Sequence, residues 1–163
     1  MSVWGWILCG YVLVATIPLV IVDFRAHRLP NVIVVPGIGL ALACIGGAWL
    51  TSGEFPLVPS LSGLAYACGM LLLAVLGGMG MGDVKLALVL GTASGMLGAS
   101  AAIANVFLAF VLGGVAAVVV LLWQRIRHRR RTRTGQHHTR THIAFGPFML
   151  AGFWVSTLVV VLR

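Results

Sequence analysis

The sequence predicts an all-α membrane protein with six transmembrane helices, and three observations support this fold class. Of its 163 residues, 60% are hydrophobic, and the mean hydropathy is +1.07. Only 9% are charged, whereas about a quarter of the residues in an ordinary soluble domain are charged. The apolar residues gather in runs close to the roughly 20 residues that a helix needs to cross a bilayer. We therefore expect residues 1–163 to form a single polytopic membrane domain.

Short polar connections separate the first three expected spans. Residues 23–31 contain Pro30, which cannot continue a helix that begins upstream, and Asn31, the expected N-cap of the next helix. Residues 51–56 form the second connection. The chain begins without a Lys or Arg ahead of its first apolar run, so we expect that run to stay as a membrane helix.

The stretch 84–123 is interpreted as two spans. Its only charged residue is Lys85, and a single helix of this length would be about 60 Å long, twice the thickness of the hydrocarbon core. We expect the turn between Gly95 and Asn105, with Asn105 either in the turn or hydrogen-bonding between helices. The six expected spans are 3–22, 32–50, 57–76, 84–99, 104–123 and 143–162.

A basic segment at 124–142 separates the last two spans, and we expect it to be a cytoplasmic loop. It holds seven of the arginines and four of the five histidines. Basic segments beside a bilayer bind anionic head groups, so membrane lipid is an expected partner. Nucleic acid is not, because neither a folded domain nor interleaved aromatic side chains accompany these charges.

No residue pattern indicates a metal or redox site. The three cysteines stand singly in apolar segments without the C-x-x-C spacing of such sites, so we expect all of them to be buried packing residues: Cys9, Cys44 and Cys68. The histidines lack a regular ligand spacing. We therefore expect a protein that needs neither a metal nor another cofactor.

The six-span topology brings two of the three acidic residues to one membrane face. Connections after the first, third and fifth spans hold ten of the eleven basic residues, and only Arg163 lies opposite. Positively charged loops stay in the cytoplasm, so both termini are expected to be external. Asp23 ends the first span and Asp83 begins the fourth, at the same depth on the cytoplasmic face. Glu54 lies on the other face.

Asp83 closes the segment 77–85, which reads GGMGMGDVK between apolar stretches. A carboxylate near hydrocarbon costs a few kcal/mol, so a functional site is the first interpretation. An interhelical turn that ends in an aspartate is the other. Because glycine lacks a Cβ, Gly80 and Gly82 are expected to let the loop adopt positive φ and let a substrate backbone approach it closely.

Two carboxyl groups at one depth suggest aspartic peptidase chemistry. If Asp23 and Asp83 approach each other, they share a proton; the ionised one then takes a proton from water and the protonated one polarises the scissile carbonyl. A small proton- or ion-coupled transporter could use the same pair as a relay, but no carboxylate is placed near the midplane. A structural subunit of a secretion complex would leave the glycine loop unexplained.

Three stretches, in this order, extend the likeness to a known family. They are Asp23 with the basic residues and Leu29-Pro30-Asn31 that follow it, Gly80-Met81-Gly82-Asp83-Val84-Lys85, and Phe145-Gly146-Pro147-Phe148 at the last span. In this combination the chain resembles the type IV prepilin peptidases, which are GxGD-type aspartic proteases of the bacterial inner membrane. It resembles their short form, found with tight-adherence pili, because it lacks the paired-cysteine segment associated with methylation.

The resemblance implies roles for individual residues. Asp23 and Asp83 would be the catalytic pair, while Gly80, Gly82 and Lys85 would belong to the substrate loop. The substrate would be a pilin-like precursor whose short basic leader is cut at the cytoplasmic face of the inner membrane. Methyltransferase activity is not expected, the stretch 145–148 is assigned to packing, and homo-oligomerisation is left open.

Overall fold

The computed structural model describes residues 3–26, 30–76, 80–128 and 145–162, and the structural statements below concern these residues. It confirms the all-α fold, since the described residues form six helices and no strand. The helices are α1 (Val3–Ala26), α2 (Asn31–Ser52), α3 (Leu57–Val75), α4 (Met81–Leu97), α5 (Ala99–His128) and α6 (Gly146–Val161).

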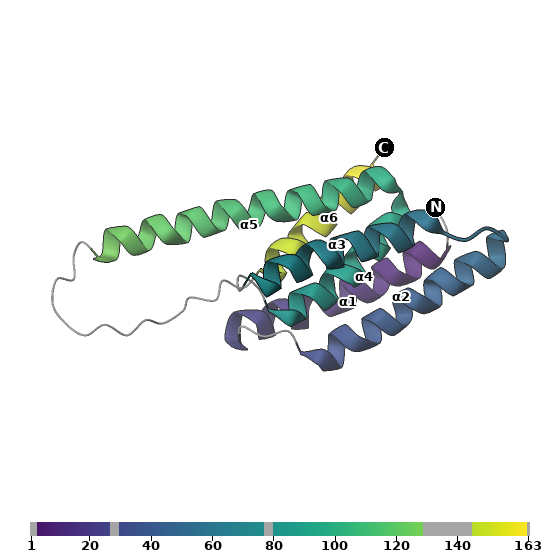
Figure 1. Cartoon of the computed structure of the whole chain (residues 1–163), viewed down its shortest axis with the longest axis horizontal. Helices are drawn as coiled ribbons and strands as arrows, with labels where there is room; N and C mark the ends of the chain where they lie inside the picture. Colours follow the sequence, from purple (N-terminus) through teal and green to yellow (C-terminus); the bar gives the residue numbers. More distant parts are fainter. Residues whose placement is uncertain (1–2, 27–29, 77–79, 129–144, 163) are drawn as a thin grey trace.

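Successive helices run in opposite directions (Figure 1). The C-terminal ends of α1, α3 and α5 therefore lie toward the same end of the bundle as the N-terminal ends of α2, α4 and α6, and both chain termini lie toward the other end. The green end of α5 extends well beyond its neighbours (Figure 1). Asp23, near the end of α1, and Asp83, near the start of α4, are thus carried to one end of the bundle.

Helix α4 is the centre of the bundle, because it contacts each of the other five helices. All residues from Val89 to Gly95 are buried. A helix that is apolar on all sides is stable only inside a packed structure or a membrane, and residues 86–97 carry no charged side chain. Packing around α4 therefore fixes where its first turn, with Asp83, is held.

Small residues let α3 and α4 approach each other closely. A Cβ added to Gly91 would lie 2.7 Å from the Ser62 carbonyl oxygen, and one added to Gly63 would overlap the Thr92 hydroxyl. Gly95 meets α3 in the same way. Because no side chain fits between these backbones, the glycines at 91 and 95 serve helix packing of the small-xxx-small kind.

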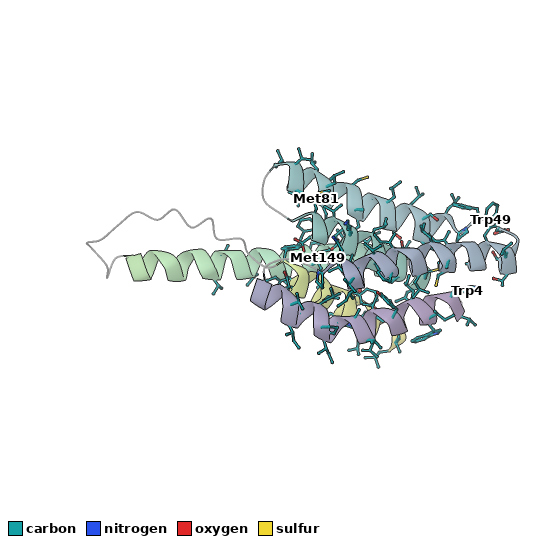
Figure 2. All side chains as sticks on the ribbon, turned by 90° about the horizontal axis from the view of Figure 1, so that it is seen from below. Trp4, Trp49, Met81 and Met149 are labelled. Atoms are coloured by element: carbon teal, nitrogen blue, oxygen red, sulfur yellow. The ribbon has the colours of Figure 1, made fainter. Side chains whose placement is uncertain are left out.

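Three helices are long and apolar enough to cross a membrane, namely α1 over Val3–Asp23, α2 and α3. The other apolar stretches recognised in the described residues, Ala99–Val115 of α5 and α6, are shorter. Many large hydrophobic side chains point outward, as they do on helices whose outer faces contact lipid. Trp4 and Trp49 lie at the end of the bundle opposite Met81 (Figure 2). The six crossings and the external termini remain predictions.

Most helix ends differ from the predicted span boundaries, and the differences are largest at α1 and α5. Helix α1 continues past residue 22 to Ala26, and α5 continues to His128, so residues 124–128 are helical and not part of a loop. Hydropathy marks where apolar sequence stops, but arginine is a good helix former and a helix that has begun extends at little cost. The rest of the predicted basic loop, 129–142, lies outside the described residues.

The turn between α4 and α5 falls inside the predicted interval. It consists of Gly98, which has a φ of +134°, a conformation open to glycine and costly for residues with a Cβ. The stretch 84–123 therefore holds two helices, as predicted, joined by a connection of one residue.

One cysteine lies where the sequence did not predict it. Cys9 and Cys44 are buried, but Cys68 is exposed. On α3 the side that faces the bundle carries Tyr66 and Met70, and Cys68 points away from it at 100° per residue. Because lipid-facing surfaces are as apolar as the interior of a membrane bundle, apolar neighbours in sequence do not reveal which side is buried.

Candidate active site

Asp83 is the third residue of α4, and the start of this helix is built around its carboxylate. Gly80 occupies the N-cap, and its carbonyl accepts a hydrogen bond of 3.1 Å from the Asp83 backbone N–H. In return, the Gly80 backbone N–H hydrogen-bonds to the Asp83 carboxylate. This reciprocal pairing resembles a capping box, in which the third helical residue reaches back to the N-cap. The side chain is 8% exposed.

Asp23 reaches the same region from α1, near the C-terminal end of that helix, and is 4% exposed. Its charge acts electrostatically on Asp83, so the structure brings together two acidic residues that are far apart in the sequence. Contacts of α1 with α4 hold this arrangement. Two like charges with so little access to water cannot both ionise without a large cost, and one shared proton removes that cost.

Glu54, the third acidic residue, is not part of this site. It lies in the exposed turn between α2 and α3, at the opposite end of the bundle (Figure 1). Its backbone N–H is hydrogen-bonded to the Ser52 hydroxyl at 3.3 Å. The predicted separation of Glu54 from the two aspartates is therefore observed.

The glycines before Asp83 are in ordinary backbone conformations, contrary to the prediction that they use positive φ. Gly80 has φ −82°, and Gly82 is helical. Among the described glycines only Gly53 and Gly98 have positive φ. The reason is local: the first turn of α4 begins directly after Gly80, which leaves an extended N-cap in place of a left-handed turn. A close approach of a substrate backbone remains a prediction.

Lys85 joins α4 to the start of α2. Its Nζ donates a hydrogen bond of 2.9 Å to Asn31 Oδ1. Asn31 was predicted as the N-cap of α2, but it is the first helical residue, and Pro30 occupies the N-cap position without a side-chain cap bond. The amide oxygen of Asn31 is engaged by Lys85 instead. This bond ties together the two motif segments that contain the aspartates.

Tyr66 is a residue near this site that sequence reasoning did not identify. It lies on α3, is 3% exposed, and lies within electrostatic range of Asp83. Its spacing from Gly63 and Met70, by three and four residues, places all three on the side of α3 that is buried. That spacing is visible in the sequence, but it does not say which helix this side faces.

The other polar residues of the core link helices. Asn105 of α5 donates from Nδ2 to the Leu90 carbonyl at 3.4 Å and to the Ser94 hydroxyl at 3.3 Å, both on α4. Of the two roles predicted for Asn105, the helix-to-helix hydrogen bond is the observed one. Phe145, just before α6, packs against Gly113 and Phe110 of α5, in keeping with the packing role expected for this stretch.

The described residues offer no metal-binding cluster. Within them, no three side chains of His, Cys, Asp or Glu are grouped so that they could hold an ion. Residues 129–144, which contain most of the histidines of the basic segment, are not among those described.

Comparison with known proteins identifies a family. The model of the type IV leader peptidase family matches residues 7–118. The matched region includes both aspartates, the glycines before Asp83, and Tyr66, and it stops before the basic segment. No curated protein and no solved structure matches the chain.

Proposed function

The chain belongs to the type IV leader peptidase family, and from this premise we propose that it is a membrane-embedded aspartic endopeptidase that removes the leader of pilin-like precursors. The observation that carries the proposal is the proximity of Asp23 and Asp83. Both are nearly inaccessible to solvent, and each lies within the other's electrostatic range. A pair of this kind holds one proton between two carboxyl groups, which is the state that aspartic peptidase chemistry needs.

In the proposed reaction the two carboxyl groups act in opposite senses. The ionised group takes a proton from water as the water oxygen attacks the scissile carbonyl carbon. The protonated group donates a hydrogen bond to the carbonyl oxygen, which gains the electron pair of the breaking π bond. The carbon–nitrogen bond then breaks as this electron pair re-forms the carbonyl group, and the departing amine takes a proton from the carboxyl group that first received one. Either aspartate can fill either role, because the proton belongs to the pair.

The position of the pair fits a substrate that is anchored in the bilayer. The aspartates lie toward one end of an apolar bundle, where α1 ends and α4 begins. A precursor with a hydrophobic helix could lie along the lipid-facing surface and present the bond before that helix at this end. The basic leader would then remain on the cytoplasmic face, as the distribution of positive charge in the chain predicts.

The burial of Asp23 and Asp83 sets a condition for substrate binding. At 4% and 8% exposure, neither carboxyl group can touch a peptide bond without displacement of the side chains that cover it. We therefore infer that the substrate binds to a more open arrangement than the one described.

The test is precursor cleavage by purified protein reconstituted in lipid, with Asp83→Asn compared to wild type. Asparagine conserves shape but cannot hold or release the catalytic proton, so cleavage should fall by several orders of magnitude, on the order of 10⁴. Glu54→Gln is the matched control and should cleave at a near-normal rate. An Asp83→Asn protein that inserts at normal abundance and still cuts at the wild-type rate would exclude the aspartic mechanism, and proton flux should then be measured.

A further inference from the structure

The Tyr66 hydroxyl is a buried polar group that the packing of the helices does not use. The Oη atom is inaccessible to solvent and has no hydrogen-bond partner among the described residues. A buried hydroxyl without a partner has lost its hydrogen bonds to water and has formed none within the protein. A phenylalanine would fill the same space without this cost.

The other tyrosine in the chain shows what a structural role looks like. Tyr11 of α1 donates its hydroxyl hydrogen bond to the Ile33 carbonyl of α2. Its ring also packs against Gly37, where an added Cβ would lie 2.9 Å from the ring. The hydroxyl of Tyr11 thus joins two helices, whereas that of Tyr66 joins nothing in the described structure.

Tyr66 nevertheless lies within the electrostatic range of Asp83, one member of the acidic pair. Helices α3 and α4 are packed with almost no space between their backbones at Gly63 and Gly91. This contact fixes the position of Tyr66 along the helix axis relative to the first turn of α4. The Asp83 charge acts on the phenol, yet no hydrogen bond joins the two groups. An unused donor therefore lies inside the protein within the electrostatic range of a carboxylate.

We propose that Tyr66 is a further catalytic residue, whose hydroxyl donates a hydrogen bond to the carbonyl oxygen of the scissile peptide bond when substrate is bound at the acidic pair. The inference rests on the proposed function. A donor held in place before the reaction, in a site shielded from bulk water, stabilises the negative charge that develops on the carbonyl oxygen.

The phenol keeps its proton throughout the reaction. Water attacks the carbonyl carbon and gives a proton to the ionised aspartate, while the carbonyl oxygen receives the π electron pair and accepts hydrogen bonds from the protonated aspartate and from Tyr66. When the carbon–nitrogen bond breaks, the electron pair returns to form the carbonyl group and the amine leaves with the proton taken from water. The hydrogen bond to Tyr66 is strongest at the intermediate and weakens again in the product.

The experiment compares Tyr66→Phe with Tyr11→Phe, each in full-length protein reconstituted in lipid with a fluorogenic peptide precursor. For Tyr66→Phe we expect kcat to fall roughly 100- to 1,000-fold with KM changed less than about threefold. Its unfolding temperature should be equal to or above that of the wild type, because an unpaired buried hydroxyl has been removed. For Tyr11→Phe we expect the reverse, with kcat unchanged and the unfolding temperature lowered.

Each other outcome overturns the inference in a recognisable way. A wild-type kcat for Tyr66→Phe assigns the ring to packing, and a fall in both kcat and unfolding temperature assigns the hydroxyl to structure. A rise in KM alone shows that the group binds substrate without acting on the reacting oxygen. Asp23→Asn is measured in parallel: if it is inactive, failure at Tyr66 leaves the proposed function intact, and if it cuts normally, the proposed function itself fails.

Discussion

The two halves of α4 differ in the polar groups that surround them. Toward its middle and C-terminal end lies a neutral cluster, in which Asn105 and Ser94 are joined to each other and to the Leu90 carbonyl. At its N-terminal end lies an acidic cluster, in which Asp83 lies within the electrostatic range of Asp23 and both have little solvent access. Both clusters are inside the same bundle, and both are formed by contacts of one central helix.

The difference shows how a packing group can be told from a functional one. Neutral groups that bond across helices contribute modestly to stability in a membrane, typically about 0.6 kcal/mol each. Buried like charges do the opposite, because each raises the cost of ionising the other. Such an arrangement does not serve stability, so the acidic cluster fits the proposed chemistry, while the neutral cluster fits a role in helix packing.

The largest effect is expected when both members of the acidic cluster are changed. If Asp23 and Asp83 work as one unit, the double variant Asp23→Asn/Asp83→Asn should cleave within about tenfold of either single variant, because effects within a unit are not additive. Single-turnover cleavage by the reconstituted proteins measures this. If the losses of cleavage in the two single variants multiply in the double variant, the two residues act independently. The contrast between the acidic and the neutral cluster would then fail.

A large effect on folding, and not on catalysis, is expected when a side chain is introduced into the contact between α3 and α4. In Gly91→Ala the new Cβ meets the Ser62 backbone, and overpacking of this kind typically costs about 1–3 kcal/mol. Thermal unfolding in detergent is the measurement. Gly69→Ala is the control, since nothing lies within 4 Å of an added Cβ there; it should be neutral or stabilising. Equal effects would show that this contact does not hold the bundle.

A smaller effect is expected in the neutral cluster. Asn105→Ala removes the amide that bonds to Leu90 and Ser94 and should lower the stability by roughly 0.5–2 kcal/mol, while cleavage per folded molecule stays near normal. Unfolding and kcat are measured on the same preparation. A loss of kcat greater than about tenfold would move the neutral cluster into the catalytic machinery.

The smallest effect is expected at the bond between Lys85 and Asn31. Because this pair is partly accessible to solvent, its loss should change cleavage by less than about fivefold. If Lys85 only joins α4 to α2, Lys85→Met and Asn31→Ala should have equal effects on kcat/KM. A clearly greater loss with Lys85→Met would support the place in the substrate loop that was predicted for Lys85.

Much of the fold follows from hydropathy, proline and glycine. The apolar runs and Pro30 locate the first helices, and the length of 84–123 requires the break that occurs at Gly98. Hydropathy cannot show that α5 continues to His128, because a helix and the hydrocarbon layer end for different physical reasons. It also cannot separate the bundle-facing side of α3 from the side that carries Cys68.

The candidate site was partly visible in the sequence. Alternating helix directions and scarce carboxylates were enough to place Asp23 and Asp83 together, because both follow from counting spans. Tyr66 was not predicted, since a tyrosine within an apolar span shows nothing of whether its hydroxyl has a partner. The bond between Lys85 and Asn31 also depends on how α2 and α4 pack, which no local pattern records.

The hydrogen bond from the Gly80 amide to the Asp83 carboxylate makes the backbone sensitive to the location of a proton. An ionised carboxylate accepts such a bond more strongly than a protonated one does. Under the proposed mechanism, each proton that arrives on Asp83 loosens the first turn of α4, and each departure tightens it again. Hydrogen exchange at the Gly80 amide should therefore follow the protonation of the catalytic acid within each turnover.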